Sequence, residues 1–276
     1  MPKSQAIDHK YLRQQYFPHI WCAGCGHGIV LSGALRAIAA LKLEQDKVAV
    51  ISGIGCSSRV AGYLDFNTLH TTHGRALAFA TGVKLAKPEL TVIVATGDGD
   101  AAAIGGNHLI HAARRNIDIT CICFNNHIYG MTSGQYSPTT PFEARATTAP
   151  YGNLERPFDL CKLAAASGAT YVARTTTYHA PQLAGLLRKG IQNSGFSFID
   201  VISGCPTYYG RRNDLRTATA LLEWQRDNSV TLKDAESMAP EALEGKYIIG
   251  ELVNRRAPEY CAVYDQLIAR LQERAG

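Results

Sequence analysis

The chain has 276 residues, of which 46% are hydrophobic and 18% are charged, and it contains 25 glycines and 11 prolines. This is ordinary globular usage, and it excludes the collagen-like, low-complexity and disordered classes. The net charge of +5 arises from 28 basic and 23 acidic residues. Because the sequence has no run of lysines and arginines, we expect no nucleic-acid partner.

The sequence also predicts no membrane span. Charged residues such as Arg36, Lys84 and Arg114 interrupt the apolar stretches before they reach the roughly 20 residues that a bilayer requires. The start Met1–Gln5 continues into polar sequence without the apolar region of a signal peptide. We therefore expect a cytoplasmic protein whose eight cysteines are reduced.

Helix-like and strand-like segments alternate from residue 26 onward. The helical segments carry apolar residues at helical spacing, whereas the strand segments are short and rich in Val and Ile. In chain order the sequence predicts a helix over 28–43, a strand over 48–51, a helix over 75–87, a strand over 90–95, a helix over 101–115, a strand over 117–124, a strand over 171–174, a helix over 181–192 and a strand over 198–202.

This rhythm predicts an α/β fold with a doubly wound parallel sheet. Helices that join short apolar strands by right-handed crossovers cover both faces of such a sheet. Residues 127–157 contain four prolines and little periodicity, so we expect a long functional loop there. We divide the chain into an α/β domain over 1–210 and a C-terminal extension over 211–276. The extension loses the strand rhythm, ends in a helical segment over 258–274 and is expected to contact another subunit.

A Gly-Asp-Gly turn follows the predicted strand 90–95. Taken alone, Gly97-Asp98-Gly99 is typical of a tight turn that uses the conformational freedom of glycine. A calcium-binding EF-hand loop starting at Asp98 is excluded, because Ala102 and Leu109 fall where ligands are required. Asn125-Asn126 follows the next strand after a gap of 25 residues. The two motifs together resemble the fingerprint of thiamine-diphosphate enzymes.

The chemistry of this fingerprint suits a hard cation. Neighbouring parallel strands present the groups at their carboxyl ends on one edge of the sheet, and Mg²⁺ takes oxygen ligands. The glycines let backbone N–H groups approach a phosphate at a helix N-terminus. By the resemblance, the side chains of Asp98 and Asn126 and the main-chain oxygen of Ile128 bind Mg²⁺ against the pyrophosphate of thiamine diphosphate.

Four of the eight cysteines are predicted near the same edge. Cys22 and Cys25 form a Cys-x-x-Cys pair that lacks the buried strand preceding a thioredoxin-type redox motif. Cys56 and Cys205 each follow a predicted strand, so a site of four thiolates is geometrically plausible. Zinc, an iron–sulfur cluster and ordinary buried cysteines all remain open on spacing alone. The other four have no assigned role, and the two on the strand 117–124 are expected in the core: Cys121, Cys123, Cys161 and Cys261.

Several spaced motifs, taken in order, resemble the β subunit of 2-oxoacid:ferredoxin oxidoreductases. The resemblance spans roughly residues 15–215, and the ordered set is far more specific than any one motif. The motifs are Cys22-x-x-Cys25-Gly26-His27-Gly28, Gly53-Ile54-Gly55-Cys56-Ser57-Ser58-Arg59, Thr72-His73-Gly74-Arg75-Ala76, Gly97-Asp98-Gly99-Asp100, Asn125-Asn126-x-x-Tyr129-Gly130-Met131-Thr132-x-Gly134-Gln135 and Cys205-Pro206.

The resemblance implies roles for individual residues. It assigns Cys22, Cys25, Cys56 and Cys205 to one [4Fe–4S] cluster. His73 would contact the phosphate side of the cofactor, although a helix-capping or core histidine is an equally good interpretation. The full set expected around thiamine diphosphate is Ile54, Gly55, Cys56, Ser57, His73, Gly97, Asp98, Gly99, Asp100, Asn126, Ile128, Tyr129, Gly130, Met131 and Thr132.

Two features bear on the substrate. Residues 204–213 are most similar to the 2-oxoglutarate enzymes of the family. Arg59 lies three residues after Cys56, where a guanidinium could bind the distal carboxylate of a dicarboxylic oxoacid. An exposed loop arginine is the alternative, so pyruvate remains a rival substrate. Thr132 is expected to line the substrate cavity.

The implied reaction is the oxidative decarboxylation of 2-oxoglutarate with coenzyme A to succinyl-CoA and CO₂, or its reverse. Electrons would pass through the cluster to ferredoxin. The chain shows no second α/β unit for the pyrimidine of the cofactor, so we infer an α subunit that supplies a glutamate there, in an α₂β₂ enzyme. The ferredoxin-like cysteine pattern is absent, so one cluster per chain is expected. A non-oxidative thiamine-dependent decarboxylase and a zinc-stabilised binding module are the alternatives.

Overall fold

The computed structural model describes residues 9–275 and shows one sheet of eight strands. The start Met1–Gln5, which the prediction of a cytoplasmic protein used, lies outside the described residues. Within the described range, no helix combines the length and the hydropathy needed to cross a membrane. The strands are β1 (Val48–Ser52), β2 (Asn67–His70), β3 (Thr91–Gly97), β4 (Thr120–Asn125), β7 (Tyr171–Thr176), β8 (Ser197–Ile202), β9 (Ser229–Thr231) and β10 (Tyr247–Asn254).

The sheet is mostly parallel and has the order β2-β1-β3-β4-β8-β7-β10-β9. Strands β2 to β7 in this order run parallel, β10 runs antiparallel to β7, and β9 pairs parallel with β10. From β1 the chain continues to β2 on one side of β1, whereas the following strand, β3, lies on the other side of β1. The strand order therefore reverses at β1. In open α/β sheets, ligands bind beyond the carboxyl ends of the strands at such a reversal.

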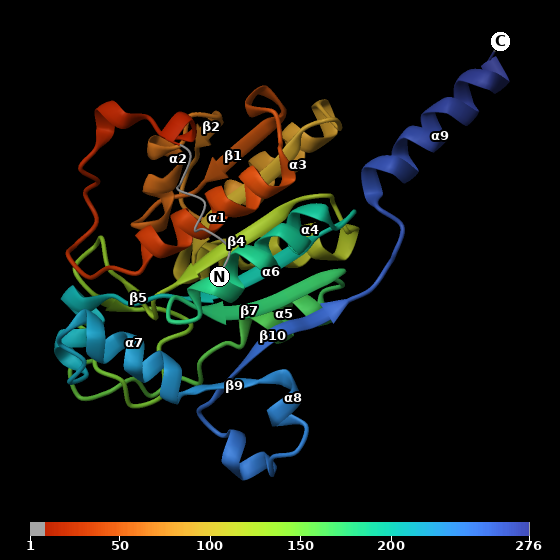
Figure 1. The fold of residues 1–276 in the computed structure, drawn as a ribbon. Coiled ribbons are helices and arrows are strands. Elements are labelled where there is room, and N and C mark those ends of the chain that lie inside the picture. Colours follow the sequence, from red (N-terminus) through yellow and green to blue (C-terminus); the bar gives the residue numbers. More distant parts are fainter. Residues whose placement is uncertain (1–8, 276) are drawn as a thin grey trace.

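Helices cover both faces of this sheet (Figure 1). One face packs against α1 (His27–Leu41), α2 (Val60–Tyr63) and α6 (Ala180–Gln192), and the other against α3 (Ala76–Ala86), α4 (Gly106–Arg115) and α5 (Leu160–Ala166). Successive residues of β8 alternate between the two cores, with Phe198 in one and Ile199 in the other. The predicted doubly wound α/β fold is confirmed.

The four cysteines without an assigned role all lie in one of these cores. Cys121 and Cys123 point to the same face of β4, as their spacing predicts, and both are fully buried. Cys161 in α5 and Cys261 at the start of the last helix join the same core. These thiols fill the interior.

The C-terminal extension contributes to the sheet, which the sequence interpretation missed. It contains α7 (Ala218–Asp227), β9, α8 (Leu232–Ala235), β10 and α9 (Tyr260–Ala275). The prediction that strand structure stops before residue 211 is wrong, because β10 pairs with β7. This strand is mostly half-buried and has a register irregularity between Glu251 and Val253, so polar and apolar residues do not alternate cleanly.

The last helix, α9, projects away from the body of the molecule (Figure 1). It begins close to the predicted residue 258. Apolar side chains recur along it at helical spacing and are each more than a third exposed, namely Tyr260, Val263, Tyr264, Leu267, Ile268 and Leu271. An amphipathic helix normally buries such a face.

Candidate functional site

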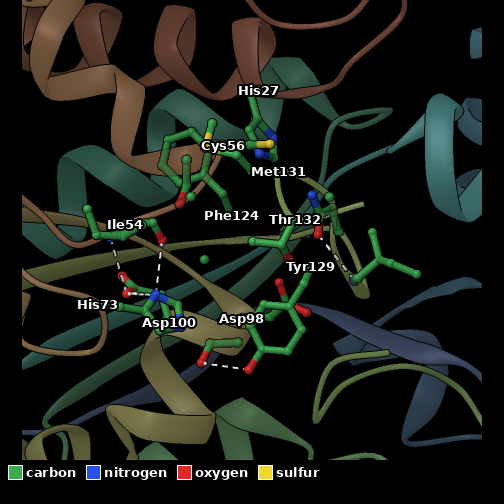
Figure 2. A pocket seen from close by; sticks show the side chains of 17 residues that line it. His27, Ile54, Cys56, His73, Asp98, Asp100, Phe124, Tyr129, Met131 and Thr132 are labelled. Atoms are coloured by element: carbon green, nitrogen blue, oxygen red, sulfur yellow. Dashed lines mark hydrogen bonds and ion pairs between the residues drawn. The ribbon is translucent and has the colours of Figure 1, made fainter. Parts of the chain in front are cut away.

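Loops at the carboxyl edge of the sheet enclose a cavity of about 170 Å³. They follow β1, β3 and β4 and are joined by the segment before α3. All the residues expected around the cofactor line this cavity, from Ile54 to Thr132. His27, Cys56 and Met131 lie toward one end, and Asp98 and Asp100 toward the other (Figure 2). That these residues bind a cofactor stays a prediction.

Asp98 and Asn126 lie directly after β3 and β4, and both are buried. The Asn126 side-chain oxygen accepts a hydrogen bond from the Ile128 backbone N–H at 3.3 Å, which holds the turn that follows β4. Burial raises the pKa of Asp98 to about 6, although the Ser137 hydroxyl donates to its carboxylate and opposes that rise. A carboxylate, an amide oxygen and a main-chain carbonyl form the oxygen donor set that Mg²⁺ requires.

Asp100 holds two of the loops together. Its Oδ1 accepts hydrogen bonds from the backbone N–H groups of Gly74 (2.6 Å) and Ile54 (3.3 Å), and it lies 2.9 Å from Nδ1 of His73. Its Oδ2 accepts from the Thr96 hydroxyl at 2.8 Å. Asp100 thus lines the cavity as predicted, but its oxygens are occupied by protein donors. Its structural role is to fix the loop after β1 against the segment before α3.

Glycines let these loops approach one another. A side chain on Gly99 would collide with the ring of Tyr129, whose hydroxyl donates to the Gly99 carbonyl at 3.4 Å. A side chain on Gly53 would collide with the carboxylate of Asp100, and Gly74 has a φ of +71°. Glycines in all three loops therefore allow the loops to pack closely against one another.

The segment after β4 forms a hairpin over the cavity. Strands β5 (Ile128–Tyr129) and β6 (Gln135–Tyr136) pair antiparallel, and Met131 and Thr132 lie between them. The Thr132 hydroxyl donates to Oε1 of Gln135 at 2.6 Å, and the Gln135 amide donates back to the Thr132 carbonyl. Thr132 lines the cavity, where the sequence predicts substrate contact.

A second cavity of about 230 Å³ is lined by Cys22, Cys25, Cys56 and Cys205. The four cysteines that the sequence predicts near one edge therefore line one cavity. A Cβ on Gly130 would lie 3.6 Å from the sulfurs of both Cys56 and Cys205. Among residues 9–275, no three His, Cys, Asp or Glu side chains are close enough together to ligate a single metal ion. The sulfurs thus surround a space and do not converge on one point.

The surroundings of Cys25, Cys56 and Cys205 favour the protonated thiols when no metal is bound. Burial raises the pKa of Cys25 to about 12 and that of Cys56 to about 11, and the neighbouring sulfurs add to both rises. Burial also raises the pKa of Cys205. Metal ligation requires thiolates, so a metal centre here would displace protons as it forms.

His27 and Phe124 are cavity residues that the sequence interpretation missed. His27 begins α1 and is buried, with Nδ1 3.0 Å from the Ser203 hydroxyl and its ring edge against Phe124. Burial lowers the pKa of His27 to about 4, so the imidazole is neutral at physiological pH. Its position directly after the Cys-x-x-Cys-Gly motif was the available signal, because a residue two positions after Cys25 must lie close to it.

Arg59 is not part of either cavity lining. It is exposed in the short helical turn that follows Cys56, and its charge opposes part of the rise in the Cys56 pKa. The predicted contact with a distal carboxylate stays a prediction.

A third cavity, of about 470 Å³, is larger than both but has a different character. Three of its charged groups are already paired, since Arg174 forms ion pairs with Asp200 at 3.0 Å and with Asp159. Its volume alone does not identify it as the functional site, because this mostly buried charged cluster on its wall is satisfied within the protein.

Fold and site together define a class of protein. A parallel sheet that gathers a Gly-Asp-Gly turn and an asparagine beside a carboxyl-edge cavity is the pyrophosphate-binding domain of thiamine-diphosphate enzymes. In agreement, residues 53–201 match the family described as thiamine pyrophosphate enzyme, C-terminal TPP binding domain.

The relatives narrow the class. The chain is 54% identical over 267 residues to "2-oxoglutarate synthase subunit KorB" of Methanothermobacter marburgensis, covering 97% of this chain and 93% of the relative. It is 55% identical over 263 residues to the protein of the same name from Methanocaldococcus jannaschii, covering 95% and 97%. The chain belongs to the KorB family, the β subunits of 2-oxoglutarate:ferredoxin oxidoreductase.

A solved structure agrees with this assignment. It is the 2-oxoglutarate:ferredoxin oxidoreductase from Magnetococcus marinus with 2-oxoglutarate, coenzyme A and succinyl-CoA bound. The TM-score is 0.86 at 37% identity, and the match covers 98% of this chain and 92% of the other. The predicted family is confirmed, and the chain is one subunit of a multi-subunit oxidoreductase.

Proposed function

We propose that this β subunit holds Mg²⁺-thiamine diphosphate and one [4Fe–4S] cluster in its two adjoining cavities. The observation that carries the proposal is that the cavities share four lining residues, Cys56, Asn126, Gly130 and Met131. When bound, thiamine diphosphate supplies the cleavage chemistry at the 2-oxo carbon, and the cluster supplies one-electron transfer. The shared wall supports binding of the two groups side by side.

The residues of this chain then have separate tasks. Asp98, Asn126 and the Ile128 carbonyl hold Mg²⁺, and Asp100 keeps the surrounding loops in place. Cys22, Cys25, Cys56 and Cys205 ligate the cluster. Arg59 binds the distal carboxylate of 2-oxoglutarate, and Thr132 lines the substrate side.

A partner subunit completes the site. The cofactor cavity of about 170 Å³ is smaller than the roughly 300 Å³ at which pockets for a whole small-molecule ligand begin. This supports an α subunit that binds the pyrimidine half and supplies a glutamate there. Coenzyme A accepts the acyl group, ferredoxin accepts the electrons, and the enzyme assembles as α₂β₂. The apolar face of α9 supports subunit contact by the extension 211–276.

The test is the metal and cofactor content of the anaerobically purified enzyme, with Cys22→Ala compared with Cys261→Ala. We expect about four irons and four sulfides per β chain in the unmodified enzyme. Cys22→Ala should lose iron and 2-oxoglutarate-dependent ferredoxin reduction but keep Mg²⁺-thiamine diphosphate. Cys261→Ala removes a core thiol remote from the site and should keep both. Stoichiometric zinc without iron would contradict the cluster, and unchanged ferredoxin reduction by Cys22→Ala would contradict its proposed role.

A further inference from the structure

The carboxylate of Asp98 is held by hydroxyl groups from the long loop. Its Oδ2 accepts hydrogen bonds from the hydroxyls of Ser137 at 2.5 Å and Thr139 at 2.6 Å. All three side chains are buried. Because both donors converge on Oδ2, they fix the rotation of the carboxylate and leave Oδ1 as the oxygen that neither hydroxyl uses.

The hydrogen bonds continue from Thr139 to the C-terminal extension. Nδ1 of His127 lies 3.3 Å from the Thr139 hydroxyl, and Nε2 of His127 lies 3.1 Å from the hydroxyl of Tyr247 in β10. The rings of His127 and Tyr247 are stacked, with centroids 5.7 Å apart. Strand β10 of the extension therefore reaches the metal-ligand candidate Asp98 through two intermediates.

The hydrogen bonds of this series can all run in one direction, from Tyr247 toward Asp98. A neutral imidazole carries a single N–H, so one ring nitrogen of His127 donates while the other accepts. If Tyr247 donates to Nε2, then Nδ1 carries the proton and donates to Thr139. The single hydroxyl proton of Thr139 is then directed to the charged acceptor Asp98, the closest of its acceptors. Aligned hydrogen bonds of this kind polarise one another.

We propose that Thr139, His127 and Tyr247 are positioning residues that orient Asp98 for the cation, so that strand β10 of the extension sets Mg²⁺ affinity. This inference rests on the proposed Mg²⁺ site. It gives the extension a task within the cofactor site, in addition to subunit contact. Partners that orient a metal ligand commonly change metal affinity by roughly tenfold to a hundredfold when removed.

Removing only the hydroxyl of Tyr247 tests the proposal with little effect on packing. The ring of Tyr247 also contacts Trp224, and phenylalanine preserves that contact. Tyr171→Phe is the matched control, because the Tyr171 hydroxyl is also buried and donates to the Leu186 carbonyl, far from Asp98. Thr139→Val removes the hydroxyl that contacts Asp98, and Thr139→Ser keeps it.

The experiment measures Mn²⁺ binding to the assembled enzyme in the presence of thiamine diphosphate, with free Mn²⁺ counted by electron paramagnetic resonance. We expect the apparent Kd for Mn²⁺ to rise about fivefold in Tyr247→Phe and at least about tenfold in Thr139→Val. Thr139→Ser and Tyr171→Phe should stay within about twofold of the unmodified enzyme. A merely structural role predicts equal effects of the two Tyr→Phe variants on Mn²⁺ affinity.

Two adverse results have different meanings. If the unmodified enzyme binds Mn²⁺ but Tyr247→Phe and Tyr171→Phe have the same affinity, the positioning role of Tyr247 is refuted and the proposed function stands. If the unmodified enzyme binds neither Mn²⁺ nor thiamine diphosphate, the proposed site is refuted, and the positioning role is refuted with it.

Discussion

Replacing Asp100 tests whether one carboxylate organises the cofactor loops. Asp100→Ala removes the acceptor for Gly74, Ile54 and Thr96, and it leaves buried donors unpaired. At about 1.5 kcal/mol for each of the three hydrogen bonds to a charged group, the loss in the free energy of unfolding is about 4.5 kcal/mol. For a chain of this size, that corresponds to a fall in melting temperature of roughly 9 to 18 °C.

Asp100→Asn removes the negative charge of the side chain but keeps its shape. One amide oxygen can still accept from the Gly74 N–H, while the amide N–H₂ faces Thr96, whose hydroxyl can rotate to accept. We therefore expect a smaller loss of about 1 to 2 kcal/mol. The order of stability should be the unmodified protein, then Asp100→Asn, then Asp100→Ala.

The assay is thermal unfolding by circular dichroism, combined with titration of thiamine diphosphate in the presence of Mg²⁺. Affinity for the cofactor should fall in the same order as the melting temperature, because the loops held by Asp100 form the cavity wall. Asp227→Ala, which removes an exposed ion-paired carboxylate, is the control and should change neither. If Asp100→Ala melts within about 2 °C of the unmodified protein, the carboxylate does not hold these loops.

Two further predictions concern pH and assembly. Since burial raises the pKa of Asp98 to about 6 and Mg²⁺ competes with the proton, apparent Mg²⁺ affinity should be constant above pH 7 and fall about tenfold per pH unit below 6. Mg²⁺ titrations at pH 7.5, 6 and 5 measure this affinity, and parallel titrations of free thiamine diphosphate correct for Mg²⁺ bound by the cofactor alone. An affinity that stays constant down to pH 5 would contradict the prediction. The double variant Leu267→Asp and Leu271→Asp should weaken co-purification with the partner subunit without lowering the melting temperature, since both side chains are exposed on α9. Undiminished co-purification would show that this face is not the contact.

The elements that carry the site were predictable because their signals are local. The strands β1, β3, β4 and β8 are short, fully or almost fully buried runs of Val, Ile and similar residues, and parallel pairing buries both faces. The loops after them then meet at one edge as a matter of topology. This is why the sequence alone could place residues as distant as Cys56 and Asn126 at one cavity.

The parts that were missed depend on tertiary contacts. Strand β2 is largely exposed, and β10 is half-buried with an irregular register, so neither shows a clear alternation. The predicted helix over 101–115 begins with a π-helical turn, Asp100–Ile104, in which Asp100 turns its carboxylate toward the loop after β1. The hydroxyl contacts of Thr139 with Asp98 span 41 residues and leave no periodic signal in the sequence.

The loop after β1 lines both cavities. A substitution that loosens this loop should therefore disturb both cavities. Ile54 lines the cofactor cavity, Cys56 lines both, and the Ile54 N–H is bound by Asp100. A shift of this loop must therefore move a proposed cluster ligand and a proposed cofactor contact at the same time. It follows that Asp100→Ala should lower iron retention as well as affinity for thiamine diphosphate, although Asp100 contacts none of the four cysteines through a hydrogen bond in the described structure. Loss of cofactor affinity with full iron content would show that the two cavities are held independently.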